Sequence, residues 1–167
     1  MTRYQRAVHG AEAGAIAAVT LEVAFFVFDS IRLVPLATPL VLSGASMGPG
    51  GAALDLSSLT GVIGGVWGFY QILTLTLVHL ATFAAVGVCA ALLFDWSRPG
   101  NLGRLGVVAL LSTAGFYGTV AISSSLVALD SVGTLPIIGI NLLAAGVLAG
   151  GLRLVSMPVP DAGEQAA

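Results

Sequence analysis

Four side chains that can exchange protons or ligate a metal lie inside or beside long apolar runs of this chain. They are His9, Glu12, Glu22 and His79. An ionisable group is costly in hydrocarbon, so each one inside a membrane span is a candidate for a functional role. Glu22 and His79 lie deepest in their runs, and a carboxyl and an imidazole at that depth suit proton transfer or cation binding.

Glu22 continues a stripe of small residues that recurs at three- and four-residue steps through Ala11, Gly14, Ala15 and Ala18. Small residues let helices approach closely in lipid, so this stripe is expected to face other helices. Two interpretations of Glu22 stay open. It is either a proton or cation ligand, or a neutral carboxyl that is hydrogen-bonded between helices.

His79 shares a helical face with Gln71, Leu75 and Thr82. It is interpreted as a proton relay, as a haem ligand, or as a neutral imidazole hydrogen-bonded to a neighbouring helix. A bis-histidine haem needs a second histidine at similar depth. The other histidine, His9, is displaced by roughly 10 Å or more when counted at helical rise, so haem is disfavoured.

His9 and Glu12 are three residues apart, a spacing that predicts a pair on one helical face at the membrane interface. Four further polar residues, counted by depth, are expected in a layer with Glu22 and His79: Gln71, Thr113, Tyr117 and Asn141. Two interpretations of this layer stay open. If it is functional, it lines a small cavity beneath an irregular outer segment. If it is structural, it is a set of buried side-chain hydrogen bonds.

No catalytic constellation, metal-ligand spacing or phosphate-binding loop occurs, so no catalytic residue, metal or cofactor is expected. The single cysteine, Cys89, excludes an intrachain disulfide. A G-x-x-x-G pair at Gly146 and Gly150 is typical of close helix packing and weakly indicates a dimer.

The elements that must position these residues are transmembrane helices. Hydrophobic residues make up 57% of the 167 residues and charged residues 8%, against about 25% charged in soluble domains. A span needs about 20 apolar residues. We predict an all-α integral membrane protein, a single bundle over residues 1–157 followed by a disordered polar tail at 158–167. The four spans are expected at residues 8–28, 66–94, 105–129 and 135–155.

The first run carries Glu12 and Glu22, so it is predicted to be a retained helix and not a signal peptide. Residues 30–65 form an irregular segment with Pro35, Pro39 and several glycines. A loop across the outer mouth, with a short helical turn after Pro39, is favoured. An interfacial helix, a re-entrant hairpin and an extra pair of spans stay open.

Orientation follows from the arginines. Five arginines fall on one side of this arrangement, namely Arg3, Arg6, Arg98, Arg104 and Arg153. Only Arg32 falls on the other side. The bias predicts a multi-pass protein of a bacterial inner membrane with both termini cytoplasmic. The aromatic residues Trp67, Phe69, Tyr70 and Trp96 are expected to anchor the span ends at the interfaces.

There is no basic patch, so nucleic acid is not an expected partner. The expected partners are the lipid bilayer and other membrane-protein subunits or further copies of this chain. The favoured function is a non-catalytic subunit, assembly or scaffold protein of a membrane complex. The first alternative is a small transporter or a proton or ion pathway that uses Glu22 and His79. The second is a haem-binding protein or membrane enzyme.

Overall fold

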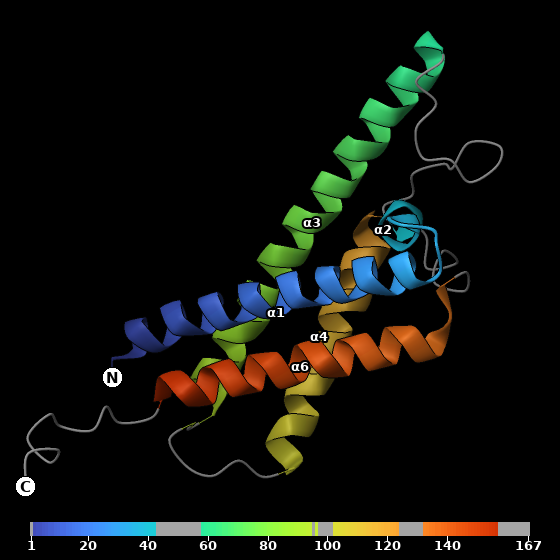
Figure 1. The fold of residues 1–167 in the computed structure, drawn as a ribbon. Helices are drawn as coiled ribbons and strands as arrows, with labels where there is room; N and C mark the ends of the chain where they lie inside the picture. The colour runs from blue at the N-terminus through green and yellow to red at the C-terminus, as the bar shows by residue number, and fades with distance from the viewer. Residues whose placement is uncertain (1, 43–57, 95, 97–101, 124–131, 157–167) are drawn as a thin grey trace, which may run out of the picture.

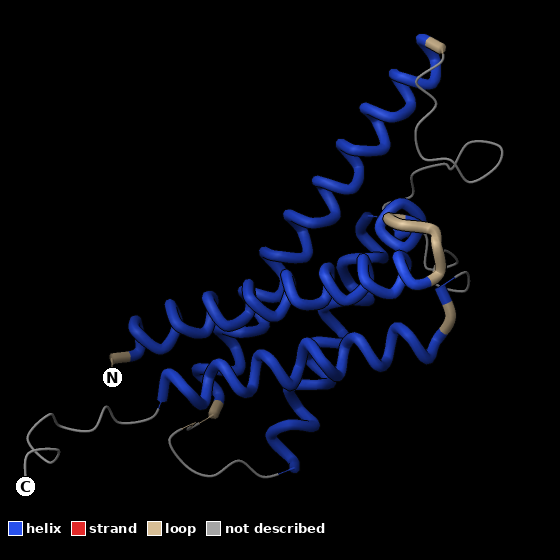
Figure 2. The backbone as a smooth tube through the Cα atoms, viewed as in Figure 1, coloured by secondary structure: helices blue, strands red, loops and turns tan. Residues whose placement is uncertain are grey.

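The computed structural model describes residues 2–42, 58–94, 96, 102–123 and 132–156. These residues form five helices and no strand (Figures 1 and 2). The helices are α1 (Arg3–Ile31), α2 (Ala37–Leu42), α3 (Leu59–Leu93), α4 (Leu102–Ser123) and α6 (Thr134–Ser156). All except α2 are long and apolar enough to cross a membrane. The predicted all-helical class with four candidate membrane spans is confirmed.

The four long helices are arranged as a ring. Helix α1 packs against α3 and α6, and α4 packs against the same two helices from the other side. The start of α1 and the end of α6 lie at one end of the bundle, and α2 lies at the opposite end (Figure 1). We refer to this opposite end, where α1 finishes, as the α2 end.

Hydroxyl caps set where two helices begin. The Thr2 hydroxyl accepts a hydrogen bond from the Gln5 backbone N–H, and the Gln5 side chain accepts one from the Thr2 N–H. The Ser58 hydroxyl accepts one from the Gly61 N–H, so α3 begins at Leu59. These bonds satisfy N–H groups that a helix start leaves free. Residues 59–65, predicted to belong to the irregular segment, are therefore helical, which corrects the expected start at residue 66.

The described part of the irregular segment is a turn followed by α2. Leu33 and Leu36 adopt left-handed backbone conformations, with φ of 58° and 67°, and the chain reverses there. Helix α2 has six residues, too few to cross a membrane. The expected helical turn near Pro39 is present. Residues 43–57 lie outside the described residues, so the loop, interfacial, re-entrant and extra-span interpretations of that stretch stay predictions.

Glycines form the contact between α1 and α3. A methyl group placed on Gly14 would overlap the carbonyl oxygen of Phe83, and one placed on Gly87 would overlap that of Gly10. The two backbones are in direct contact, which is how small residues associate helices in lipid. The buried face of α1 thus includes Gly10 and Gly14, whereas Ala11 is only half-buried. The predicted stripe therefore lies partly to one side of the buried face of α1. Spacing alone did not locate that face because α1 carries small residues on several sides.

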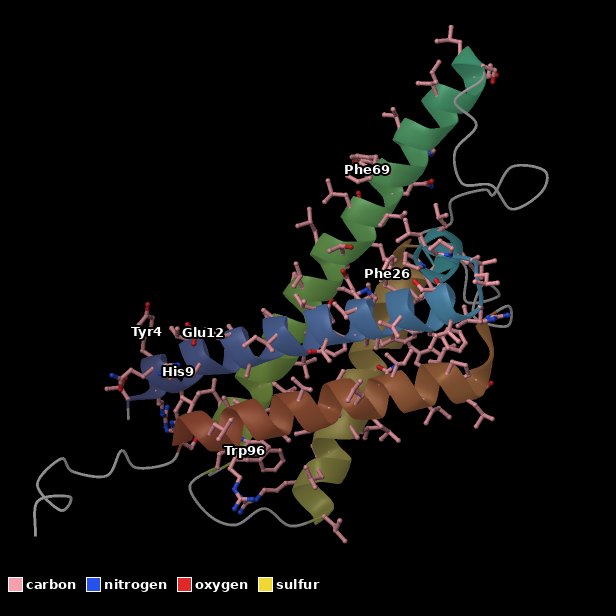
Figure 3. The ribbon with its side chains drawn as sticks, viewed as in Figure 1. Tyr4, His9, Glu12, Phe26, Phe69 and Trp96 are labelled. Carbon is pink, nitrogen blue, oxygen red and sulfur yellow. The ribbon has the colours of Figure 1, made fainter. Side chains whose placement is uncertain are left out.

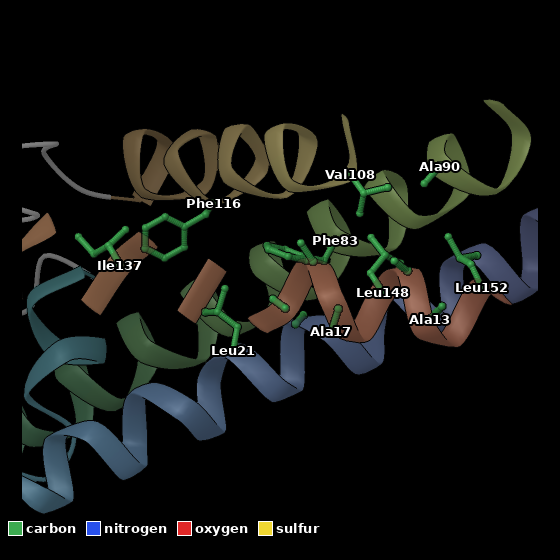
Figure 4. Packing of buried hydrophobic residues seen from close by; sticks show 14 of the residues in the cluster. Ala13, Ala17, Leu21, Phe83, Ala90, Val108, Phe116, Ile137, Leu148 and Leu152 are labelled. Atoms are coloured by element: carbon green, nitrogen blue, oxygen red, sulfur yellow. The ribbon is translucent and has the colours of Figure 1, made fainter. Parts of the chain in front are cut away.

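The core inside the ring is mainly apolar (Figure 4). Phe83 and Phe116 are its largest fully buried side chains, and Leu21, Ile137 and Leu148 fill the space around them. Many large apolar side chains point outward from the same helices. That distribution fits a protein whose surroundings are hydrocarbon, because lipid imposes no need for a polar outer surface.

The amino-terminal half of α3 extends well beyond the other helices (Figures 1 and 2). Helix α3 has 35 residues, or about 52 Å at the helical rise of about 1.5 Å per residue. Helix α4 has 22 residues and α6 has 23, or about 33 and 35 Å. The name projecting half is used below for Leu59–Tyr70, the first 12 of the 35 residues of α3.

The aromatic residues at the two ends of α3 behave differently. Trp67 and Tyr70 are exposed on the projecting half and stack on each other, with ring centroids 5.5 Å apart. Trp96 is buried, and its indole N–H donates a 2.9 Å hydrogen bond to the Ala90 carbonyl. Trp96 therefore packs against the carboxyl end of α3, and its predicted place at a membrane interface stays a prediction.

Candidate functional site

The helices α1, α2 and α3 surround a cavity of about 260 Å³. Helix α1 contributes residues 21–23, 25 and 26 to its lining. The turn before α2 contributes residue 36, and α2 contributes 38, 39 and 42. Helix α3 contributes 72, 75, 76 and 79. We call it the Glu22 cavity. Glu22 and His79, singled out by their depth in separate apolar runs, both contribute to its wall.

Glu22 is half-buried and contacts α3 through a single described hydrogen bond. The Thr76 hydroxyl donates to Glu22 Oε2 at 3.3 Å. This bond joins the two helices on the far side of the glycine crossing from the start of α1. Glu22 therefore points between helices, as the sequence predicts. Of the small residues expected beside it, Gly14 and Ala18 are buried, whereas Ala11 and Ala15 are half-buried.

His79 is buried against the aromatic core. Its ring stacks on Phe116, with centroids 5.5 Å apart and planes at 28°, and lies 6.0 Å from the Phe83 ring. Phe116 in turn stacks on Phe25 of α1 at 5.9 Å. These contacts hold the imidazole in one orientation. Its Nε2 atom is buried and has no hydrogen-bond partner among the described residues.

The cavity is closed on one side and open on the other. Leu21, Phe25 and Leu75 are almost fully buried and form its floor with His79. Phe26, also in the lining, is exposed, and it lies on the part of α1 nearest α2 (Figure 3). The mouth thus opens among outward-facing apolar side chains.

Asp29 holds α2 against the end of α1. Its Oδ2 accepts the Thr38 backbone N–H and its Oδ1 accepts the Thr38 hydroxyl, both at 2.6 Å. Asp29 is fully buried, and Thr38 lines the cavity. Asp29 was not among the predicted site residues. Spacing could have identified it, because Leu21, Phe25 and Asp29 share one helical face.

The remaining predicted site residues do not line the cavity. Asn141 is buried and donates to the Ile137 carbonyl of its own helix, and its Oδ1 has no partner among the described residues. Gln71 Oε1 is buried without a described partner, and Tyr117 packs edge-on against Phe116. Thr113 is half-buried on α4. These residues were predicted at a depth similar to that of Glu22, but they lie on other helices or other helical faces and do not reach the cavity.

A second polar contact between helices was not anticipated. The Thr119 hydroxyl of α4 lies 3.3 Å from the Thr82 hydroxyl of α3, and it also donates to the Gly115 carbonyl at 2.9 Å. Thr82 was placed on the His79 face by its spacing, but its partner on α4 was not identifiable from spacing. This contact ties α3 to α4 and does not extend the cavity.

The predicted pair of His9 and Glu12 is confirmed. His9 Nδ1 and Glu12 Oε2 are 3.0 Å apart, and both side chains are exposed near the start of α1 (Figure 3). Gly10, next to His9, contacts Gly87, which lies two turns or about 12 Å along α3 from His79. The two histidines therefore do not converge on a haem. Among the described residues, no three His, Cys, Asp or Glu side chains are placed to hold a metal ion.

The chain matches no protein-family model, no curated protein and no solved structure. The site is therefore interpreted from its own chemistry. It combines a carboxyl, a hydroxyl and an imidazole in a largely apolar cavity. Such a set can hold a proton or the polar end of a bound molecule.

Proposed function

We propose that this protein is a non-catalytic, multi-pass protein of a bacterial inner membrane that serves as a subunit, assembly or scaffold protein of a larger membrane complex. The observation that carries the proposal is the projecting half of α3. An apolar helix of that length needs more cover than a bilayer supplies, and neighbouring protein is the natural source of that cover. The arginine distribution supports an orientation with both termini in the cytoplasm.

The length of α3 supports a protein partner. The helix carries no charged residue from Leu59 to Leu93 and measures about 52 Å, against about 30 Å of hydrocarbon and about 40–45 Å for a whole bilayer. Tilting it wholly into hydrocarbon would need an angle of roughly 55°, beyond the usual range of about 0–40°. Part of the projecting half therefore lies where lipid tails do not cover it.

The composition of the projecting half points the same way. Leu59, Ile63, Val66, Trp67 and Tyr70 are exposed and share one helical face by their spacing, and Val62 and Phe69 are exposed beside it. The exposed apolar surface is therefore broad, and the segment carries no charged residue. A broad exposed apolar face without charges is expected to be covered by lipid or by protein. Exposed aromatic residues with few rotatable bonds are also typical of protein-binding surfaces.

The geometry of the Glu22 cavity favours a non-catalytic role. Two hydroxyls in the lining already donate to carboxyl oxygens: Thr38 to Asp29 at 2.6 Å and Thr76 to Glu22 at 3.3 Å. Glu22 and Thr76 lie inside helices, where backbone N–H groups are already bonded and cannot stabilise a developing oxyanion. The described backbone beside Glu22 therefore offers no oxyanion donor, which supports a binding role.

A photocrosslinker tests the partner directly. A benzophenone amino acid placed at Ile63, which is 60% exposed on the projecting half, is expected to form protein adducts in living cells. Ile16 on α1 is also 60% exposed and serves as the matched control, expected to react with lipid alone. Adducts are separated on a denaturing gel and identified by mass spectrometry.

The adducts distinguish a different membrane protein from a second copy of this chain as the partner. Crosslinking of residue 63 to a different membrane protein supports a subunit, assembly or scaffold role. An adduct with twice the mass of the chain assigns the surface to a homo-oligomer and overturns the heteromeric role. Equal protein crosslinking at both positions, or none at residue 63, removes the basis for the proposal.

A second candidate function is a proton or ion pathway, because Glu22 and His79 line the same cavity. Purified protein in liposomes would then carry protons measured by a pH-sensitive dye inside, and Glu22→Gln would abolish that flux. Flux that is absent, or that is equal in the variant, argues against this candidate.

A further inference from the structure

The mouth of the Glu22 cavity shows from which phase a ligand would come. Val23, Phe26 and Leu36 line the cavity and are 55%, 48% and 42% exposed, so its rim is formed by outward-facing apolar side chains. In a membrane-spanning helix such side chains face hydrocarbon. A molecule therefore reaches the cavity from the lipid phase and must itself be lipophilic.

The interior of the cavity shows what the polar end of that molecule must do. Glu22 accepts the Thr76 hydroxyl on Oε2, and no hydrogen bond is described for its Oε1. His79 is almost fully buried, and its Nε2 has no partner among the described residues. A bound group that hydrogen-bonds to these atoms would remove the cost of leaving a buried polar atom unpaired.

We propose that the Glu22 cavity binds the hydroxyl end of a lipophilic phenol taken from the bilayer. A hydroxyl both donates and accepts, so it complements the Glu22 carboxyl and either tautomer of His79. It is neutral, so it leaves hydrocarbon and enters the site at a lower cost than an ammonium group. Phe25 and Phe26 lie on the same wall and provide aromatic contacts for a ring.

The size of the cavity fits this class. About 260 Å³ lies just below the usual range of small-molecule pockets, roughly 300–1,000 Å³. It accommodates one substituted ring, and an attached alkyl chain would pass through the rim between the lipids.

The nearby carboxylate does not compete for the ligand. Asp29 is fully buried, and each of its oxygens already accepts a hydrogen bond from Thr38. Glu22 is thus the one carboxyl in the lining that the structure describes. A cation would have a single anionic partner there, whereas a hydroxyl can use Glu22 and His79 together.

A photoreactive probe tests the proposal on the full chain in lipid nanodiscs. The probe is a 4-alkylphenol with a diazirine at the start of the alkyl chain, compared with its methyl ether and with the corresponding benzylammonium. We expect the phenol to label peptides that contain residues 21–26 and 72–79, in competition with unlabelled 4-alkylphenol. The methyl ether should label about tenfold less, as expected for loss of one good hydrogen bond.

Matched variants separate binding in the cavity from general lipid contact. Val23→Trp fills the rim and should abolish the competed labelling. Ile16→Trp, at a position 60% exposed on α1 and outside the lining, should leave it unchanged. Glu22→Leu should reduce labelling about tenfold, whereas Glu22→Gln, which keeps an acceptor, should retain most of it.

The proposal is overturned by any of four results. Equal labelling by phenol and methyl ether, or labelling unaffected by Val23→Trp, would mean that bulk lipid fills the cavity. Strongest labelling by the ammonium probe would assign the site to a lipophilic cation. Labelling confined to the projecting half of α3 would place the phenol elsewhere.

Discussion

At the scale of single residues, the most constrained polar contact is the pair of Asp29 and Thr38. Both hydrogen bonds are 2.6 Å long, and both residues are buried. Water therefore cannot take the place of either hydrogen bond when it breaks. Hydrogen bonds to a carboxylate are stronger than neutral ones. The pair fixes α2 against α1 and thereby fixes one wall of the Glu22 cavity.

Removing the Thr38 hydroxyl should therefore destabilise the α2 end. Thr38→Val leaves Asp29 Oδ1 without its donor and should cost about 1–3 kcal/mol of unfolding free energy. Thr38→Ser keeps the hydroxyl and loses one methyl group, for a cost of about 0.8 kcal/mol or less. Thermal unfolding in a mild detergent, followed by circular dichroism, compares the two. If Val and Ser at this position are equally stable, the hydrogen bond does not hold α2.

At the scale of elements, the bundle depends on the backbone contact between α1 and α3. Gly10, Gly14 and Gly87 allow a separation that no side chain would permit. Lipid provides no hydrophobic force between helices, so close van der Waals contact must hold them together. The Glu22–Thr76 bond and the cavity depend on this crossing, because it sets how far apart α1 and α3 lie beyond it.

A single methyl group at the crossing should weaken the bundle. Gly14→Ala would push against the carbonyl of Phe83, which is backbone and cannot rotate away, so we expect a loss of about 1–3 kcal/mol. Gly118→Ala on α4 is the matched control, because nothing lies within 4 Å of the added atom and alanine favours helix by about 1 kcal/mol. The same unfolding measurement applies to both. A Gly14→Ala variant as stable as Gly118→Ala would contradict the backbone contact.

The G-x-x-x-G pair of α6 has a different environment from the glycines of α1. A methyl group on Gly146 or Gly150 would meet nothing within 4 Å. These glycines therefore do not pack within the chain. The prediction that they contribute to a dimer stays a prediction, which a photocrosslinker at Leu142, on the same face of α6, would test.

At the scale of the whole molecule, the start of α1 and the end of α6 lie at one end of the bundle, opposite the turn between α1 and α2 (Figure 1). The arginine distribution predicts that this shared end faces the cytoplasm. Orientation follows from interactions with the membrane and the insertion machinery, so it needs its own experiment.

Cysteine labelling measures the orientation. In a Cys89→Ala background, Tyr4→Cys and Leu33→Cys place thiols at positions 78% and 88% exposed at opposite ends of the bundle. An impermeant maleimide should label residue 33 in intact spheroplasts and residue 4 only after the membrane is opened. The reverse pattern would show that the termini face the outside.

Several features of this protein follow from sequence alone. The all-helical class follows because a chain with 8% charged residues and long apolar runs must satisfy its backbone internally in hydrocarbon. The pair of His9 and Glu12 follows because three residues of helix bring two side chains together whatever surrounds them. The start of α3 was harder to predict, because Gly61, Gly64 and Gly65 weaken the helical pattern there and the Ser58 cap is a short signal.

Other features were decided only by the tertiary structure. The bond between Asp29 and Thr38 needs the chain reversal at Leu33 and Leu36. The convergence of Glu22 and His79 on one cavity, without Asn141, needs the rotation of each helix about its own axis. Helical spacing relates the side chains of one helix to each other, but the rotation of one helix against another is set by packing. Here that packing is the contact of glycine backbones in α1 and α3.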